Sequence, residues 1–470
     1  MIELSVAEVA KTLQAQITGD IQAQPCFPSV SIDSRTLEPG QCFIAIKGKR
    51  LDGHDFLEQA LRRGASLVIH SDSGGELPSW KDRVFMQVDD TTAALQILAH
   101  YARKKWNRSV LAITGSMGKT TTREFVATLL GQRFRVCQSP GNLNNEIGVP
   151  LSLLQLSEEH HLAVLELGMN HPGEIRLLSS ISSPDSALLT NVAAVHLEFF
   201  SDLDAIAAAK GEILENLPPG GRLFFNADDD RVTRLVSSYR GQKISFGLHQ
   251  EADIQVSDYQ IESLDRMSFE IESARFDLRA TVPFAGKHLL YNVAAAVAVA
   301  CSFDFSQDEL LQGISRLKVP SMRGQIHRIG KPGDQITLWD DCYNSNPEGL
   351  GMILDTVSRL EGFRRKILAL GEMLELGPAG PDFHYQAGRQ IAQSDAGLLV
   401  TVGDGSLEID RGAREAGFPA EQIKHFNATD EAAVFLAGQV VPGDLVLVKG
   451  SREVAMDRIV RHLTSRGESA

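Results

Sequence analysis

The chain has 470 residues, of which 43% are hydrophobic and 23% charged, a composition typical of globular proteins and not of disordered, collagenous or coiled-coil ones. Because one hydrophobic core rarely grows beyond about 250 to 300 residues, we expect two or three domains. The 46 basic and 60 acidic residues give a net charge of −14, which provides no long-range attraction for nucleic acid or an anionic membrane. An anionic substrate therefore needs a local basic site.

The cysteines and the N-terminal residues indicate the compartment. The five cysteines are scattered and none are spaced as C-x-x-C, so the sequence predicts neither a disulfide framework nor a zinc site. Glu3 and Glu8 stand where an export signal has basic and apolar residues. The longest uncharged stretch, residues 288–303, is shorter than the roughly 20 apolar residues that span a bilayer. We expect a cytoplasmic protein without a membrane span.

Residues 1–83 are predicted to form a small α/β domain. Ser5 and Glu8 have the spacing of a capping box, which opens a first helix. The predicted elements that follow are, in order, strands at 29–35 and 41–48, a helix at 55–64 and a buried strand at 65–70. A turn-rich segment at 71–82 then leads to a boundary near residue 84.

Residues 84–319 are predicted to form a central domain. Apolar strands alternate with helices from Val110 to residue 227, a pattern that predicts a parallel sheet with right-handed crossovers. Successive short strands at 252–283 predict an antiparallel addition at the sheet edge. Two helices, near 287–302 and 307–317, lead to the second boundary at Val319 and Pro320.

Residues 320–470 repeat the alternation of apolar strands and helices, which predicts a C-terminal Rossmann-like domain. No G-x-G-x-x-G follows its first strand, so a nicotinamide cofactor is not predicted. The expected fold class is therefore α/β with three domains: a small N-terminal domain, a central P-loop ATPase domain with a parallel sheet, and the Rossmann-like domain.

The segment from Ile113 to Thr122 joins a predicted buried strand to a predicted helix start. Backbone N–H groups and the helix dipole at such a junction can hold phosphates, Lys119 can neutralise them, and Thr120 can bind Mg²⁺. The motif departs from the common G-x-x-x-x-G-K-[ST] form because Ile113 occupies the first glycine position, and an incidental glycine turn is the alternative. The predicted nucleotide-binding residues here are Gly115, Ser116, Met117, Gly118, Lys119, Thr120 and Thr121.

Three further residues follow predicted strands or lie in a helix, and the first two of them have two interpretations each. Glu166 ends a strand at the rim where ligands bind, and it is either a metal carboxylate or a solvated strand-end side chain. His196 follows another strand after a short loop, and it either ligates a metal or caps the loop. Lys210 lies in an alanine-rich helix, where a lysine is usually a surface residue.

Ordered blocks of residues across nearly the whole chain resemble the Mur ligase family, the ATP-dependent amide-forming enzymes of peptidoglycan precursor synthesis. The blocks are residues 33–35, 40–48, 52–56, 114–121, 142–152, 166–175, 190–200, 208–214 and 286–296. The resemblance implies ATP, two Mg²⁺ ions and a UDP-linked peptide substrate. It also implies that a peptide carboxylate is activated as an acyl phosphate before an amine attacks it.

Within the family, residues 340–349, 369–377 and 448–457 most resemble the branch that joins D-alanyl-D-alanine to UDP-N-acetylmuramoyl-tripeptide. The tripeptide-forming relatives with a diaminopimelate acceptor typically carry a DNPR motif, whereas here Asn346 and Pro347 are followed by Glu348. A tripeptide-forming or folylpolyglutamate-type ligase of the same family remains the nearest alternative. A P-loop regulatory protein and a small-molecule kinase are the alternatives from other classes. A monomer is expected.

The resemblance also implies a role for each matching residue. Lys119 and the loop hold ATP, Thr120 and Glu166 place the first Mg²⁺, and His196 holds the second together with Lys210, carbamylated by CO₂. Catalysis is accordingly assigned to Lys119, Lys210 and His196. The adenine side is matched by His288 and Asn292, although Leu289 stands where the family often has Asn. The other implied contacts are Arg323 and Asp341 to the nucleotide, Ser34 and Arg35 to the uridine diphosphate end, and Asn142, Asn144, Asn145, Tyr343, Asn346, Ser451 and Arg452 to the peptide substrates.

Overall fold

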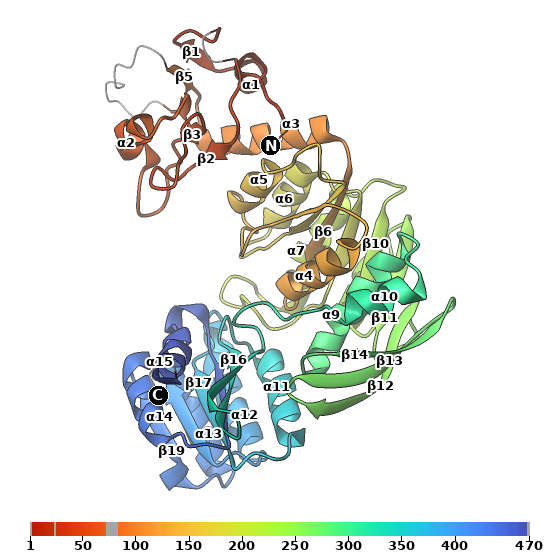
Figure 1. Ribbon diagram of the computed structural model, residues 1–470, viewed down its shortest axis with the longest axis vertical. Helices are drawn as coiled ribbons and strands as arrows, with labels where there is room; N and C mark the ends of the chain where they lie inside the picture. Colours follow the sequence, from red (N-terminus) through yellow and green to blue (C-terminus); the bar gives the residue numbers. More distant parts are fainter. Residues whose placement is uncertain (1, 23–24, 72–82, 468–470) are drawn as a thin grey trace.

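The computed structural model describes residues 2–22, 25–71 and 83–467. Three sheets of five, nine and six strands follow one another along the chain, each covered by helices (Figure 1). The predicted three-domain α/β fold is confirmed. Of the turn-rich segment predicted at 71–82, all but Ser71 lies outside the described residues.

The first sheet has the strand order β1-β5-β4-β3-β2, in which only β1 runs antiparallel to its neighbour. Its strands are β1 (Gln16–Thr18), β2 (Val30–Ser31), β3 (Cys42–Ile44), β4 (Leu67–His70) and β5 (Val84–Gln87), and its helices are α1 (Val6–Leu13) and α2 (Leu57–Arg62). The capping box of Ser5 and Glu8 begins α1 as predicted. Because β5 pairs with β4, the first sheet continues past the boundary that the sequence indicated between residues 83 and 84.

The central sheet is parallel from β7 to β12 and ends in the antiparallel strands β13 and β14, as the sequence predicted. Its order is β14-β13-β12-β11-β10-β9-β6-β8-β7. The strands are β6 (Ser109–Thr114), β7 (Val136–Gln138), β8 (Leu162–Glu166), β9 (Ser186–Leu189), β10 (Arg222–Asn226), β11 (Gln242–Gly247), β12 (Ile254–Ser263), β13 (Arg266–Ser273) and β14 (Asp277–Val282). The carboxyl ends of β6, β8 and β9 therefore meet at one edge.

Helices cover both faces of the central sheet. They are α3 (Thr91–Trp106), α4 (Lys119–Leu130), α5 (Gly148–Leu153), α6 (Glu174–Ser182), α7 (Leu203–Gly211), α8 (Asp230–Val236), α9 (Lys287–Cys301) and α10 (Gln307–Ile314). The alanine- and valine-rich helix α9 is buried on nearly all sides and packs against α4. A helix that is apolar all round needs such burial. This packing holds the start of α4, where the P-loop lies.

The third sheet has the order β15-β16-β20-β17-β18-β19 and is parallel except for the β15–β16 hairpin. Its strands are β15 (Gln325–Lys331), β16 (Asp334–Asp341), β17 (Arg365–Gly371), β18 (Leu398–Val402), β19 (Ile423–Phe426) and β20 (Asp444–Lys449). Its helices are α11 (Pro347–Arg359), α12 (Gly380–Ile391), α13 (Leu407–Glu415), α14 (Thr429–Gln439) and α15 (Asp457–Gly467). The alternation predicted for residues 320–470 is thus observed.

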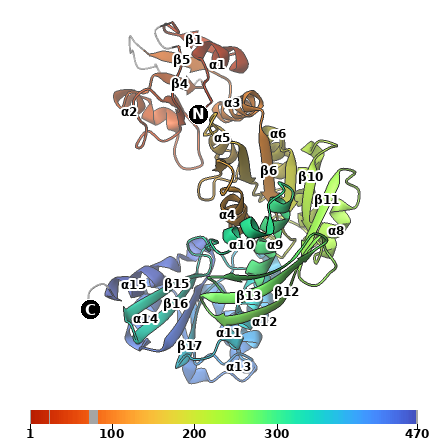
Figure 2. The ribbon, with the colours of Figure 1, turned by 45° about the vertical axis from the view of Figure 1, so that its right-hand side comes forward.

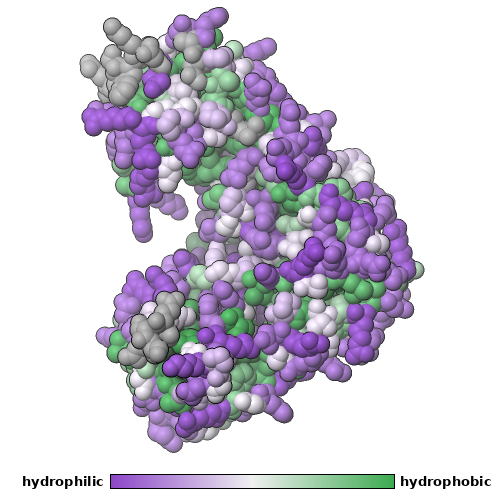
Figure 3. Space-filling view, in the orientation of Figure 1, coloured by the Kyte–Doolittle hydropathy of each residue, from purple (hydrophilic) through white to green (hydrophobic). Residues whose placement is uncertain are grey.

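The three units form a curved arrangement, with the central sheet linking the other two (Figure 2). Helix α11 of the third unit contacts α9 of the central one. The space-filling view shows a wide notch between the first and third units (Figure 3). Within the described ranges, no helix is long and apolar enough to cross a membrane.

Candidate active site

The predicted phosphate-binding loop connects the end of β6 at Thr114 to the start of α4 at Lys119. Gly115 and Gly118 have φ angles of 145° and 79°, which L-residues other than glycine rarely adopt. A Cβ atom on Gly115 would lie 1.8 Å from Oγ1 of Thr190, and one on Gly118 would lie 2.5 Å from Nδ2 of Asn292. The two glycines are therefore required by the packing of this loop against β9 and α9.

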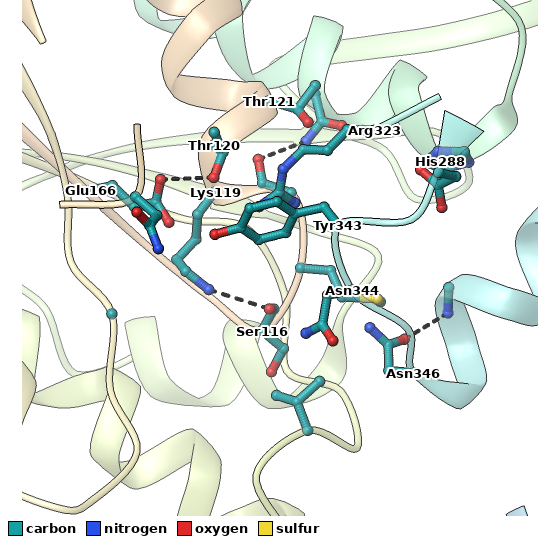
Figure 4. Close-up of a pocket in the computed structure, with 18 of the residues that line it drawn as sticks. Ser116, Lys119, Thr120, Thr121, Glu166, His288, Arg323, Tyr343, Asn344 and Asn346 are labelled. Carbon is teal, nitrogen blue, oxygen red and sulfur yellow. Dashed lines mark hydrogen bonds between the residues drawn. The ribbon is translucent and has the colours of Figure 1, made fainter. Parts of the chain in front are cut away.

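A pocket of about 320 Å³ opens at the N-terminus of α4, between the central and third units (Figure 4). The predicted residues that line it are Ser116, Met117, Gly118, Lys119, Thr120, Thr121, Asn142, Asn144, Glu166, His196, His288, Asn292, Arg323, Asp341, Tyr343 and Asn346. Most of the candidates chosen from the sequence are thus brought together in one place. They come from strand ends and loops of the central and third units and from the N-terminal parts of α4 and α9.

Lys119 is folded back onto its own loop. Its Nζ donates hydrogen bonds to the carbonyl oxygens of Gly115 at 2.7 Å and Ser116 at 3.3 Å. Burial lowers the pKa of Lys119, the nearby Glu166 carboxylate opposes this shift, and Arg323 adds to it. An anion in the pocket would compensate the positive charges of Lys119 and Arg323.

Glu166 is a buried acidic residue of the pocket. It accepts a hydrogen bond from Oγ1 of Thr120 at 2.9 Å on one oxygen and from Nδ2 of Asn144 at 2.9 Å on the other. The guanidinium of Arg123 lies 3.6 Å from the same carboxylate. Glu166 is only 2% exposed, so the interpretation as a solvated strand-end side chain is wrong. Its position follows from β8 lying beside β6 in the sheet.

His196 and Lys210 occupy different environments. His196 lines the pocket, has a φ of 58°, and its Nδ1 lies 2.5 Å from Oε2 of Glu375 in the third unit. Lys210 lies in α7, does not line the pocket and is 2% exposed, so the interpretation as a surface lysine is wrong. Burial lowers the pKa of Lys210 well below its usual value, and the neighbouring charge of Lys119 lowers it further.

The third unit contributes two charged contacts. The guanidinium of Arg323 lies 4.0 Å from the centre of the Tyr343 ring, a cation–π distance. Lys449 donates hydrogen bonds to Asp341 at 2.5 Å and to the carbonyl oxygen of Asn344 at 3.0 Å. Sequence reasoning missed Lys449, although its position at the end of an apolar strand was a usable signal.

A second cavity of about 240 Å³ adjoins the first one and shares Met117, Gly118, His288, Asn292 and Gly349 with it. Its other lining residues include Asn226, Tyr291 and Glu348, none of which the sequence singled out as site residues. Burial lowers the pKa of His288 to about 4, so the imidazole between the two cavities is neutral at physiological pH.

Seven of the predicted site residues do not line the main pocket. Gly115, Lys210, Ser34, Arg35, Asn145, Ser451 and Arg452 are the seven. Asn145 accepts a hydrogen bond from the Gly148 amide at 2.8 Å, so it serves the turn before α5, as an Asn-rich turn would. Ser451 accepts one from the Leu374 amide at 2.9 Å and joins two loops of the third unit.

Of the remaining three residues, one is buried and two are exposed. Ser34 donates a hydrogen bond to Gln59 at 2.7 Å and is buried. Arg35 is exposed and pairs with Asp33 at 2.7 Å. Arg452 is also exposed, and its guanidinium lies 3.6 Å from the Met322 sulfur at the pocket rim.

Three models of one protein family match successive parts of the chain. The catalytic domain of the Mur ligase family matches residues 27–103, the Mur ligase middle domain residues 113–300, and the Mur ligase glutamate ligase domain residues 323–452. These ranges follow the three sheets described above.

Full-length relatives and solved structures agree with the family models. UDP-N-acetylmuramoyl-tripeptide--D-alanyl-D-alanine ligase of Bacillus subtilis is 33% identical over 98% of this chain and 99% of its own length. The Escherichia coli protein of the same name is 32% identical over 99% of this chain and 100% of its own length. Crystal structure I of MurF from Acinetobacter baumannii has a TM-score of 0.86 and 29% identity, covering 98% of this chain and 99% of that one.

A further solved structure is described with a nucleotide. MurF ligase from Thermotoga maritima in complex with ADP has a TM-score of 0.80 and 28% identity, covering 94% of this chain and 98% of that one. The similarity to these solved structures extends over the first, central and third sheets of this chain. The chain belongs to the Mur ligase family.

Proposed function

We propose that the chain is an ATP-dependent ligase that joins D-alanyl-D-alanine to UDP-N-acetylmuramoyl-tripeptide. The observation that carries this proposal is the full-length similarity to relatives named for that reaction, at 32 to 33% identity. The pocket supports it, because a P-loop with its lysine faces polar side chains of a second unit (Figure 4). A concave site with convergent polar groups of this kind suits a nucleotide.

The reaction proceeds in two steps. An oxygen of the peptide's terminal carboxylate attacks the γ-phosphorus of ATP, ADP leaves, and an acyl phosphate forms. The free amine of D-alanyl-D-alanine then attacks the acyl carbon, inorganic phosphate leaves, and the nitrogen loses a proton as the amide forms. Activation is required because a carboxylate is a poor electrophile.

Lys119 is proposed to stabilise the transferred phosphoryl group. Its Nζ is already held within the loop by two carbonyl oxygens, and the amides at the N-terminus of α4 point into the same pocket. Preorganised donors of this kind act where negative charge develops and lose little energy in reorganising. Arg323, stacked on Tyr343, supplies a second cation from the third unit.

The hydroxyl of Thr120 and the carboxylate of Glu166 fit a first Mg²⁺ ion. They are hard oxygen ligands 2.9 Å apart, and magnesium prefers a few such ligands together with phosphate oxygens. Among the described residues no group of three or more His, Cys, Asp and Glu side chains is gathered for a metal, which agrees with a site completed by ATP. When bound, Mg²⁺ supplies positive charge that favours phosphoryl transfer.

His196 and a carbamylated Lys210 are proposed for a second Mg²⁺ ion. The buried Lys210 amine has a strongly lowered pKa, and the neutral amine is the form that adds to CO₂ with loss of a proton. The expected test is Lys210→Ala, which should lose activity that short carboxylates partly restore. A fully active Ala variant, together with an unmodified amine by mass spectrometry under bicarbonate, would contradict the carbamate.

The remaining roles are assigned to the three units. We propose that the first unit, which continues to Gln87, binds the uridine diphosphate end near Ser34 and Arg35. The central unit binds ATP, with His288 and Asn292 on the nucleobase side next to the second cavity. The third unit, from about residue 320, is proposed to bind the acceptor through Tyr343 and Asn346, which line the pocket, with Ser451 and Arg452 outside its lining. A monomer acting in the cytoplasm completes the proposal.

Product analysis tests the proposal directly. The enzyme is incubated with ATP, Mg²⁺, UDP-N-acetylmuramoyl-tripeptide and D-alanyl-D-alanine, and the masses of the products are measured by mass spectrometry. The expected product is the UDP-linked pentapeptide, formed together with ADP and phosphate. A stable phosphorylated product would indicate a kinase, and turnover only with another amine would indicate a different ligase of the family. Nucleotide binding without any acceptor-dependent turnover would favour a regulatory protein.

A further inference from the structure

A loop of the third unit touches the loop that carries His196. The carboxylate of Glu375, which follows β17, lies 2.5 Å from Nδ1 of His196, and its carbonyl oxygen accepts a hydrogen bond from the Glu198 amide at 3.2 Å. Two residues further on, a Cβ atom on Gly377 would lie 3.1 Å from the carbonyl oxygen of Leu197. The two loops are thus closely fitted over three consecutive residues of the central unit.

Both partners of this contact have unusual backbones. The φ angles of His196 and Glu375 are 58° and 61°, in the left-handed region that residues other than glycine seldom occupy. Such conformations cost on the order of 1 kcal/mol or more each and persist where surrounding contacts hold them. Here the contacts that hold each residue include those made by the other loop.

The contact determines which imidazole nitrogen faces the pocket. The carboxylate of Glu375 accepts the hydrogen bond, so a ring proton lies on Nδ1. Since His196 also lines the ATP pocket, its Nε2 is left with a free lone pair for that pocket.

We propose that Glu375 is a positioning residue for His196. It orients the imidazole with Nε2 toward the ATP pocket, and it does so only while the third unit is docked on the central unit. The proposal rests on the proposed function, because it assigns His196 to the second Mg²⁺ ion. Carboxylates that hold a ligating histidine in this way typically affect metal affinity by about 10- to 100-fold.

A purely structural role of Glu375 and a positioning role have different expected effects on binding. If Glu375 served only to hold the two units together, its removal would weaken nucleotide binding and both metal ions alike, and would lower the melting temperature. A positioning role instead affects the ring tautomer and the second ion selectively. The two roles are therefore separated by measuring the nucleotide, each metal ion and the ring independently.

The experiment compares Glu375→Ala and Glu375→Gln with the wild-type enzyme. Glu361→Gln is the matched control, because it removes the same charge from an exposed side chain of the same unit. Mn²⁺ binding in the presence of a non-hydrolysable ATP analogue is followed by electron paramagnetic resonance. The tautomer of His196 is read from ¹⁵N-labelled histidine, with His196→Gln used for assignment, and thermal melting checks the fold.

We expect Glu375→Ala to lower the affinity for the second Mn²⁺ ion about 10- to 100-fold, and the His196 ring should no longer be held in the Nδ1–H tautomer. The affinities for the first ion and for the nucleotide should change less than about twofold. Glu375→Gln should retain much of the second-ion affinity, because its amide oxygen can still accept a hydrogen bond from Nδ1. Unchanged second-ion affinity and tautomer in the Ala variant would overturn the proposal, as would equal weakening of both ions. Failure of the proposed function is seen separately, as absence of pentapeptide formation by the wild-type enzyme.

Discussion

The central and third sheets both deliver functional groups from the carboxyl ends of parallel strands, but they do so with different parts of the chain. The central sheet uses backbone: the loop after β6 bends at Gly115 and Gly118 and directs amides of α4 into the pocket. The third sheet uses side chains: Asp341 at the end of β16 pairs with Lys449 at the end of β20.

This difference explains why one region has a recognisable sequence motif and the other does not. A backbone cradle needs glycine at specific positions within one short segment, so it leaves a local motif. A side-chain pair needs only that two strands be neighbours in the sheet. Asp341 and Lys449 stand opposite each other in the β16–β20 register although they are 108 positions apart in the chain. The following predictions test the two regions against each other, from the largest expected effect to the smallest.

Lys119→Ala should have the largest effect. Removing the amine takes away the cation proposed to stabilise the transferred phosphoryl group, so we expect kcat to fall at least about a thousandfold. The fold should remain, because Nζ bonds only two carbonyl oxygens of its own loop. Steady-state phosphate release measures the loss, with the exposed Lys104→Ala as the control. A variant with more than a tenth of the wild-type rate would remove the P-loop assignment.

Gly115→Ala tests whether the backbone cradle depends on glycine. The new Cβ would lie 1.8 Å from Oγ1 of Thr190, at a φ of 145° that alanine does not tolerate. We expect nucleotide affinity to fall about a hundredfold, which corresponds to about 3 kcal/mol. Isothermal titration with ATP gives the affinity. Gly220→Ala is the control, because a Cβ there meets nothing within 4 Å. Equal affinities of the two variants would contradict a rigid cradle.

Lys449→Met tests the side-chain pair of the third sheet. The substitution leaves the Asp341 carboxylate without its cation in a mostly buried position, which typically costs about 3 kcal/mol. We expect a roughly tenfold to fiftyfold loss in kcat/KM and a lower melting temperature. The double variant Asp341→Asn with Lys449→Met should recover part of the stability, since the unpaired charge is gone. Additive losses in the double variant would show that the two residues act independently.

Protonation of His288 should not affect the free energy of unfolding at pH 7.5, and it should lower that free energy increasingly as the pH falls. Its pKa is about 4 in the folded chain, against roughly 6.5 when unfolded, so the unfolded state binds the extra proton between these values. Stability from this group is complete above pH 6.5 and decreases as the pH falls to 4, by roughly 3 kcal/mol in all. His288→Gln should flatten the pH dependence of denaturant unfolding by up to one proton in that window. An unchanged slope would place the imidazole in solvent contact.

The sequence by itself predicted the features that depend on local order. Alternating apolar strands and helices gave the three α/β units, and the strand, glycine loop and helix start around Lys119 gave the phosphate site. The end of an apolar strand also indicated Glu166, because residues at the carboxyl edge of a parallel sheet tend to face a ligand, whereas Asp341 came from the family resemblance. The predicted boundary near residue 84 lies just before β5, the strand that pairs with β4 in the first sheet.

Tertiary structure alone decided the features that depend on burial and on contacts between distant segments. The sequence could not show that Lys210 is buried, because its alanine-rich helix has no distinct polar face. It could not show that Asn145 and Ser451 serve loop structure, or that Lys449 meets Asp341. Nor could it pair His196 with Glu375, which are 179 positions apart. Sheet order and domain docking bring such residues together, and neither is encoded in the spacing of any one segment.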